Sequence, residues 1–172
     1  MSKYGKIKIK IAGVTEDSTV DGPGIRLVVF TQGCPFECDG CHNPDARPMT
    51  GGSEISVSEI LERIKRNPLT DGITFSGGEP FIQAQALTIL AREVHKLGLN
   101  VVTYTGYTFE EIIAGEPNYH ELLHESDYVV DGQYIQALHK DDLPFRGSSN
   151  QRIIDVKKSL ADSGKACVLT GF

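Results

Sequence analysis

Three closely spaced cysteines are the residues of this chain most suited to chemistry. Cys34, Cys38 and Cys41 have the spacing C-x3-C-x2-C and fall within eight residues, whereas the fourth cysteine, Cys167, lies far along the chain. This spacing is too crowded for an ordinary disulfide framework. It predicts a metal or redox site in a protein that occupies a reducing compartment.

The number of available protein ligands distinguishes a zinc site from an iron–sulfur site. Structural zinc usually takes four protein ligands, commonly from two cysteine pairs, and this chain has no second pair. His42 is poorly placed as a fourth ligand because it directly follows Cys41. A [4Fe–4S] cluster held by three cysteines keeps one iron open for a small molecule. The spacing favours an iron–sulfur site, with zinc or a redox thiol as alternatives.

Glycines and polar residues directly follow several predicted strands, in the segments 32–34, 76–79, 104–106 and 131–133. In parallel α/β folds, the carboxyl ends of the strands share one rim, and the active site is built there. We therefore expect these four loops to converge on one site.

Hydrophobic patterns predict the elements that position these loops. Apolar runs predict strands at residues 7–12, 25–31, 73–75, 101–102, 128–130 and 153–154, with the first at a sheet edge. Capping residues and apolar stripes predict helices beginning near Ser56, Ala84, Thr108 and Asn118. The alternation indicates an α/β fold of parallel strands with helical crossovers, either an open doubly wound sheet or part of a barrel.

Length and composition restrict the protein class. A complete eight-fold barrel typically needs about 250 residues, and this chain has 172. Without repeats or linkers, we expect one domain over residues 1–172. The net charge of −6 disfavours a nucleic-acid partner. The absence of an 18-residue apolar run and of a signal-peptide core predicts a cytoplasmic protein without a membrane partner.

The cysteine spacing, followed by Gly-Gly-Glu-Pro after the next strand, resembles the radical S-adenosylmethionine superfamily. The strings VDGPGIR, CHNPD and TFSGGEP are similar to those of the glycyl-radical activases. The strings YTGY and FRGSSNQR narrow the resemblance to activating proteins of anaerobic ribonucleoside-triphosphate reductases. These motifs occur in the family's order and cover roughly residues 4–160.

The resemblance implies a partial, open (β/α) barrel of the radical S-adenosylmethionine type. It implies that the three cysteines ligate a [4Fe–4S] cluster whose open iron chelates S-adenosylmethionine. The residues expected to contact this cofactor are Gly77, Gly78 and Glu79 at its methionine end, and Gly40, Cys41 and His42 near its adenine. Glycines let a backbone approach a ligand closely, and a carboxylate can receive an ammonium group. We expect no further catalytic side chain, because the cofactors carry the chemistry.

The implied activity is reductive cleavage of S-adenosylmethionine, which generates a glycyl radical on the anaerobic ribonucleoside-triphosphate reductase. A glycine-containing loop of the reductase would enter the open side of the barrel. The implied electron donor is a small flavodoxin or ferredoxin.

Several positions remain open. Many superfamily members have an aromatic residue at the position of Gly40, so the adenine contact is unassigned. Some activases have Asp-x-Lys where this chain has Asp131 and Gln133, and neither is placed in the site. Arg26 could pair with a carboxylate inside the barrel, and residues 21–24 could be a simple turn instead of a substrate contact.

Other functions also remain possible. The chain could activate another glycyl-radical enzyme, or act on a small molecule as deazapurine synthases do. A non-catalytic metal-binding or electron-transfer module would need a fourth protein ligand and would leave residues 77–79 unexplained. We expect Cys167 to be a buried, inert thiol on an apolar strand, and His120 and His124 to lie on a helix surface.

Overall fold

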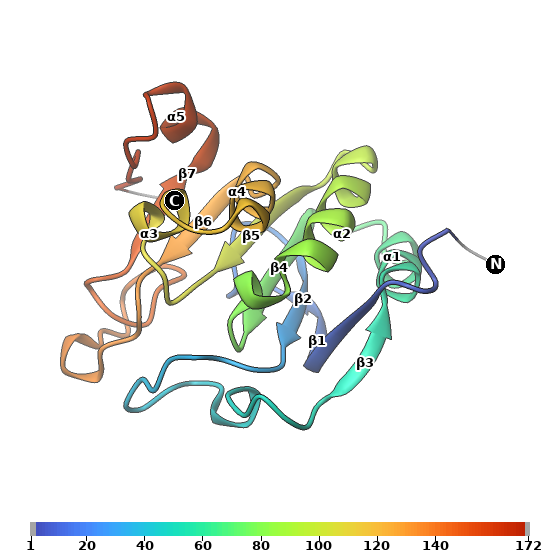
Figure 1. Ribbon diagram of the computed structural model, residues 1–172, viewed down its shortest axis with the longest axis horizontal. Coiled ribbons are helices and arrows are strands. Elements are labelled where there is room, and N and C mark those ends of the chain that lie inside the picture. The colour runs from blue at the N-terminus through green and yellow to red at the C-terminus, as the bar shows by residue number, and fades with distance from the viewer. Residues whose placement is uncertain (1–2, 171–172) are drawn as a thin grey trace.

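The computed structural model describes residues 3–170, in which seven strands form a single sheet (Figure 1). The strand order is β3-β1-β2-β4-β5-β6-β7, so β3 and β7 lie at the two edges. The strands are β1 (Lys8–Ser18), β2 (Arg26–Thr31), β3 (Ser53–Ser56), β4 (Gly72–Gly77), β5 (Asn100–Tyr104), β6 (Tyr128–Asp131) and β7 (Arg152–Asp155).

The central strands β2, β4, β5 and β6 are parallel, in a register that aligns Val28 with Thr74, Val102 and Tyr128. Helical crossovers connect them, as a parallel pairing requires. The helices are α1 (Val57–Arg66), α2 (Ala84–Lys96), α3 (Phe109–Ile113), α4 (Pro117–His124) and, after β7, α5 (Val156–Ala161). Short 3-10 turns span Pro44–Ala46, Pro80–Gln83 and Gln136–Leu138. The sheet does not close, which confirms the predicted open α/β architecture.

The two faces of the sheet carry different hydrophobic clusters, because successive side chains of a strand point to opposite sides. Leu27, Ile73 and Val101 pack with the helices in the main hydrophobic core. Val102 and Val130 belong to a smaller apolar cluster. The face that carries the smaller cluster is therefore free to form the wall of a site.

The outer strands differ from the expected parallel arrangement. Strand β1 pairs antiparallel with β2 and β3, and β7 pairs antiparallel with β6. The predicted edge position of residues 7–12 is wrong, because β3 lies outside β1. No α-helix connects β6 to β7, so the chain returns from the rim where β6 ends.

The capping boxes predicted from the sequence form at the N-termini of two helices. The Ser56 hydroxyl accepts a hydrogen bond from the Glu59 amide, and the Glu59 carboxylate accepts one from the Ser56 amide. The same capping box forms between Thr108 and Glu111. Helix α4 begins at Pro117 instead of Asn118 because proline favours the first helical position. None of the helices in residues 3–170 has the length and apolar character needed to span a bilayer.

Candidate active site

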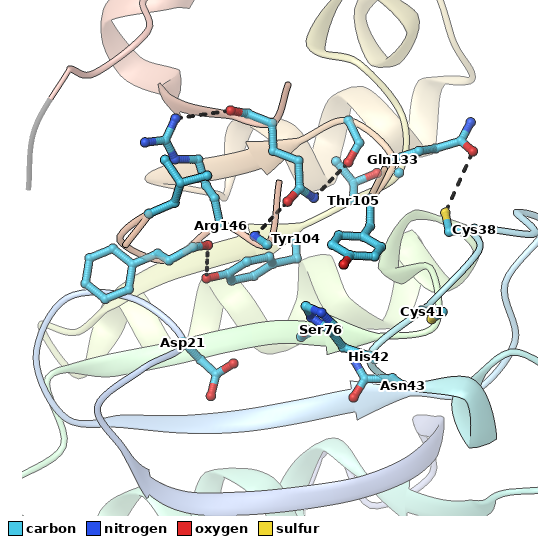
Figure 2. Close-up of a pocket in the computed structure, with 18 of the residues that line it drawn as sticks. Asp21, Cys38, Cys41, His42, Asn43, Ser76, Tyr104, Thr105, Gln133 and Arg146 are labelled. Atoms are coloured by element: carbon cyan, nitrogen blue, oxygen red, sulfur yellow. Dashed lines mark hydrogen bonds between the residues drawn. The ribbon is translucent and has the colours of Figure 1, made fainter. Parts of the chain in front are cut away.

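A cavity of about 740 Å³ opens at the carboxyl ends of the parallel strands. The four loops predicted to converge all contribute to its lining, with Cys34, Ser76, Thr105 and Gln133 as examples. Figure 2 shows these loops around the cavity, with Cys38 and Cys41 at one end and Asp21 at the other. The predicted convergence of the loops is confirmed.

The three closely spaced cysteines line this cavity as free, half-buried thiols. Their loop is held by backbone hydrogen bonds, from the Gly33 amide to the Ala46 carbonyl at 2.8 Å and from the Cys34 amide to the Arg47 carbonyl at 2.9 Å. Burial raises the pKa values of the Cys34 and Cys38 thiols. Metal binding must therefore displace protons from them.

The arrangement of thiols discriminates between a single ion and a cluster. Within the described part of the chain, no three Cys, His, Asp or Glu side chains gather closely enough to hold one metal ion. The three thiols line one cavity, and among the described residues no fourth side chain joins them as a structural zinc site requires. Thiolates are also the ligands that iron–sulfur clusters require. The donor set thus fits a [4Fe–4S] cluster better than zinc.

Gly77 ends β4, and Gly78 follows it directly against the cysteine loop. The Gly78 amide donates to the Thr31 carbonyl at 2.7 Å, and the Glu79 amide donates to the Gly33 carbonyl at 2.8 Å. A Cβ atom on Gly78 would lie 2.2 Å from the Gly33 carbonyl oxygen, and Gly77 has a φ of +91°. The sequence led us to expect a close approach to a ligand. The structure adds a close approach between two protein backbones.

Glu79 is completely buried at the cavity wall. One carboxylate oxygen accepts from the Thr105 hydroxyl at 2.9 Å and the Phe81 amide at 3.1 Å. The other accepts from the Gly106 amide at 2.8 Å. Burial raises the pKa of Glu79 to about 7, although all three donors act to lower it. Glu79 thus ties the ends of β4 and β5 together, and its contact with a cofactor stays a prediction.

The residues next to Cys41 lie in different surroundings. His42 lines the cavity, and its ring centroid lies 4.6 Å from that of Tyr134. Gly40 has a φ of +69° and is not among the cavity residues. A Cβ atom on Gly40 would lie 2.9 Å from the Gln136 amide carbon. The adenine contact of Gly40 therefore stays a prediction, while Tyr134 supplies an aromatic ring that the sequence analysis did not single out.

The loop after β6 contacts the cysteine loop and its neighbours. The Cys38 thiol donates to the Gln133 side-chain oxygen at 3.8 Å, as Figure 2 shows. Asp131, the last residue of β6, is buried and accepts from the Arg152 guanidinium at 3.0 and 2.5 Å. Asp131 also accepts from the Phe109 amide at 2.7 Å. Asp131 is thus engaged by the protein itself, whereas Gln133 reaches the cavity.

Arg26 is fully buried, and burial lowers its pKa to about 10. Its guanidinium donates to the Thr74 hydroxyl at 2.6 Å and to the carbonyls of Ile73 at 2.6 Å and Pro23 at 2.9 Å. Of the roles left open for Arg26, pairing with a carboxylate is not the one adopted, because these hydrogen bonds satisfy the guanidinium with neutral acceptors. Arg26 secures the turn at residues 21–24, from which Asp21 lines the cavity.

Cys167 does not line the cavity and is half-buried, so the expectation of a thiol buried on an apolar strand is wrong. Its neighbour Val168 forms only an isolated bridge with Ile154. His120 and His124 lie on α4, and the His120 Nε2 atom hydrogen-bonds the Ile113 carbonyl at 2.7 Å. This bond occupies one of the two ring nitrogens of His120.

Comparisons with known proteins agree with this geometry. Residues 20–154 match the family described as a 4Fe-4S single cluster domain. The chain is 34% identical over 164 residues to a pyruvate formate-lyase-activating enzyme of Clostridium pasteurianum, covering 90% of this chain and 64% of that protein. It is 33% identical over 145 residues to an anaerobic ribonucleoside-triphosphate reductase-activating protein of Escherichia coli (strain K12), covering 77% and 89% respectively.

A solved structure supports the fold. The structure of QueE from Escherichia coli aligns with a TM-score of 0.51 and 21% sequence identity, covering 60% of this chain and 55% of that chain. The chain belongs to the family of 4Fe-4S single cluster domains. Within it, the chain is a radical S-adenosylmethionine protein of the glycyl-radical activase group. The cofactors of this group are the predicted [4Fe–4S] cluster and S-adenosylmethionine.

Proposed function

We propose that this protein generates the glycyl radical of an anaerobic ribonucleoside-triphosphate reductase. The observation that carries the proposal is the position of two motifs that the sequence analysis connected with such activating proteins. Tyr104, Thr105 and Gly106 of the first motif line the cavity, as do Phe145 and Arg146 of the second. Residues of both motifs therefore line the cavity in which this proposal puts the cofactors and the substrate.

In this proposal, Cys34, Cys38 and Cys41 hold the [4Fe–4S] cluster, and the cavity beside them receives S-adenosylmethionine. The chemistry that these cofactors supply when bound is one-electron cleavage of the sulfonium, which provides a radical able to remove a glycine hydrogen. An electron donor such as flavodoxin or ferredoxin would reduce the cluster. Glu79 fixes the two loops on which the cofactor would rest, so the cavity keeps its shape before binding.

The open side of the cavity supports a protein substrate. Figure 2 shows Asp21 and Arg146 away from Cys38 and Cys41, and Val20 and Phe145 also line the cavity. Val20 is 74% exposed and can meet a partner's surface. A glycine loop has no side chain at the reacting carbon and can enter a narrow site more deeply than other residues.

The test is activation by the reduced, reconstituted protein with S-adenosylmethionine and the anaerobic reductase. We expect a glycyl radical by electron paramagnetic resonance, with 5'-deoxyadenosine and methionine as products. Exposure to oxygen should then cleave the reductase chain at the radical glycine. Cofactor cleavage without a radical on the reductase would contradict the proposal.

A second target is favoured by the 34% identity to a pyruvate formate-lyase-activating enzyme. Parallel assays with pyruvate formate-lyase therefore separate the two targets, since a radical only on that enzyme would favour the second. A non-catalytic electron-transfer module would activate neither. Anaerobic addition of S-adenosylmethionine to the reduced protein should change the resonance spectrum of the cluster if the protein is an enzyme, and leave it unchanged if it is such a module.

A further inference from the structure

The loop after β6 directs two hydrogen-bonding groups at Cys38. The Cys38 thiol lies 3.8 Å from the Gln133 side-chain oxygen, as the dashed line in Figure 2 shows. The next residue, Tyr134, faces the same sulfur with its backbone. Burial raises the pKa of the Cys38 thiol, whereas a hydrogen bond from the Tyr134 backbone acts to lower it. Two consecutive residues at the end of a distant strand therefore meet one cavity cysteine.

Cys34 has its hydrogen-bond donor inside its own loop. Burial raises the pKa of the Cys34 thiol, and the hydrogen bond that opposes this effect comes from the Phe36 backbone, two residues further along. The side-chain partner of Cys38 is Gln133, which is 95 residues away in the chain. The surroundings of the Cys38 sulfur therefore depend on how the loop after β6 is held.

Three hydrogen bonds fix the backbone at the start of this loop. The Gly132 amide donates to the Tyr107 carbonyl at 3.0 Å, and the Gly132 carbonyl accepts from the Gln151 side chain at 3.0 Å. The Gln133 carbonyl accepts from the Asn150 side chain at 2.8 Å. Gly132 has a φ of +95°, a conformation that favours glycine. The turn is therefore held against the cysteine loop by bonds that do not involve the cysteines.

Ligation of a cluster would reverse the hydrogen-bonding role of the Cys38 sulfur. The free thiol donates to the Gln133 oxygen, but a metal-bound thiolate has no proton and can only accept. The Gln133 amide carries an NH2 group on the same carbon as this oxygen, so a half-turn of the amide presents a donor in place of the acceptor. The Gln133 side chain is exposed and therefore has room to turn. The Tyr134 amide needs no rearrangement.

We propose that the Gln133 side chain and the Tyr134 backbone amide donate hydrogen bonds to the ligating Cys38 sulfur and thereby raise the reduction potential of the cluster. Hydrogen bonds to the sulfurs are among the factors that set such potentials. Reduction adds one electron from the donor protein, and the positive end of each N–H dipole stabilises the added negative charge. This inference rests on the proposed ligation of the cluster by Cys38 and is independent of which glycyl-radical enzyme is the target.

The test is a potentiometric titration of the reconstituted holoenzyme with dithionite, read by electron paramagnetic resonance of the reduced cluster. Gln133→Met keeps the length of the side chain without an N–H, so the ratio of reduced to oxidised cluster at a fixed potential should fall roughly 2- to 10-fold, as the loss of one hydrogen bond predicts. Gln133→Glu should lower this ratio further, because it also adds a negative charge. Gln85→Met and Gln85→Glu, on the exposed surface of α2, are the matched controls and should keep the wild-type ratio.

A second measurement detects the hydrogen bonds themselves. Pulsed electron–nuclear double resonance of the reduced cluster, before and after exchange into D2O, reports exchangeable protons close to it. We expect their couplings to be weaker in Gln133→Met than in the wild type, and to persist in part because the Tyr134 backbone amide is unchanged.

Three results would overturn the inference. Wild-type potentials in both Gln133 variants, with full iron content, would show that the amide does not act on the cluster. Equal shifts in the Gln133 and Gln85 variants would assign the effect to surface charge. Loss of iron from the Gln133 variants would make Gln133 a residue that retains the cluster instead of one that sets its potential. Retention of the cluster by Cys38→Ala would instead refute the proposed ligation, so the two failures are distinguishable.

Discussion

The surroundings of each cysteine determine its role. Cys34, Cys38 and Cys41 share one cavity, whereas Cys167 lies outside that lining, with its backbone amide bonded to the Ser159 hydroxyl at 2.7 Å. Thiolates that share a cavity can ligate the same iron–sulfur cluster, whereas a thiol outside the cavity cannot be a ligand of that cluster. The difference between these cysteines is therefore one of location and not of chemistry.

Replacing any one of the cavity cysteines with alanine should abolish cluster retention. A three-thiolate site that loses one ligand exposes a second iron and no longer holds the cluster firmly. Iron and sulfide content after anaerobic reconstitution measures this effect. Cys167→Ala is the matched control and should retain the cluster, so loss of iron in that variant would contradict the assignment.

Glu79 should make stability depend on pH. Its pKa is about 7 in the folded protein, against an ordinary value of 4.5, so the native state holds a proton that the unfolded chain has released between these values. The free energy of unfolding should fall as pH rises through this window, by at most about 3 kcal/mol. Urea unfolding of the cluster-free protein at pH 5, 6, 7 and 8 checks this. Glu79→Gln should flatten the profile, and an identical slope in both proteins would refute the expectation.

At the scale of elements, the end of β4 and the cysteine loop are held together by backbone contact. The amides of Gly78 and Glu79 bind carbonyls of Thr31 and Gly33, directly before Cys34. The Gly-Gly-Glu segment therefore shapes the cysteine loop as well as the cavity. A change in this strand end should alter the cluster site without touching a ligand.

Gly78→Ala should destabilise the protein by about 1–3 kcal/mol, because a Cβ atom 2.2 Å from the Gly33 oxygen forces the two segments apart. It should also reduce iron retention. Gly13→Ala is the control, since a Cβ atom there meets nothing within 4 Å. Urea unfolding and iron content measure both effects, and equal behaviour of the two variants would show that the close packing is unimportant.

Strand β7 is secured by ionic contacts instead of a helical crossover. Arg152 binds the buried Asp131 at the end of β6 and also reaches Glu110 of α3 at 2.6 Å. The Phe109 amide at the start of α3 donates to the same Asp131 carboxylate. The buried Asp131 carboxylate therefore connects β6, β7 and α3. Arg152, the last residue of the FRGSSNQR motif, has a structural role in this connection.

Across the whole molecule, residues 132–151 form a loop that connects β6 to β7 and covers the cysteine loop. It contacts Cys38 through Gln133 and His42 through Tyr134. The Gln136 side chain also fills the space beside Gly40. The two loops come from opposite halves of the chain, and because they contact each other we expect order in one to depend on order in the other.

Removing the cluster should therefore loosen both loops together. Hydrogen exchange of the reconstituted and cluster-free proteins should show faster exchange in residues 33–43 and 132–151 without the cluster. Amides of α1 are the internal control. This helix packs in the main hydrophobic core, on the face of the sheet opposite the smaller apolar cluster. Faster exchange in residues 33–43 alone would contradict the coupling of the two loops.

The sequence by itself determined the cofactor chemistry and much of the local structure. The cysteine spacing is local, as are the capping boxes at Ser56 and Thr108, because all their partners lie within a few residues. The placement of polar loops after parallel strands was also predictable, since parallel pairing brings carboxyl ends to one rim. Local chemistry and regular topology therefore sufficed to predict the cavity and to favour an iron–sulfur site, whereas the class of protein came from the resemblance of the motifs to a known family.

Only the tertiary structure decided which distant residues the site side chains contact. The Cys38 thiol meets Gln133, 95 residues away, and the Glu79 carboxylate meets Gly106, 27 residues away. Strand β3 was missed because its four residues, SEIS, carry too little pattern to predict a strand. The buried state of Glu79 and the antiparallel pairing of β7 with β6 both arise from contacts between separate segments. No spacing along the chain encodes such contacts, because they exist only after the sheet has brought its loops together.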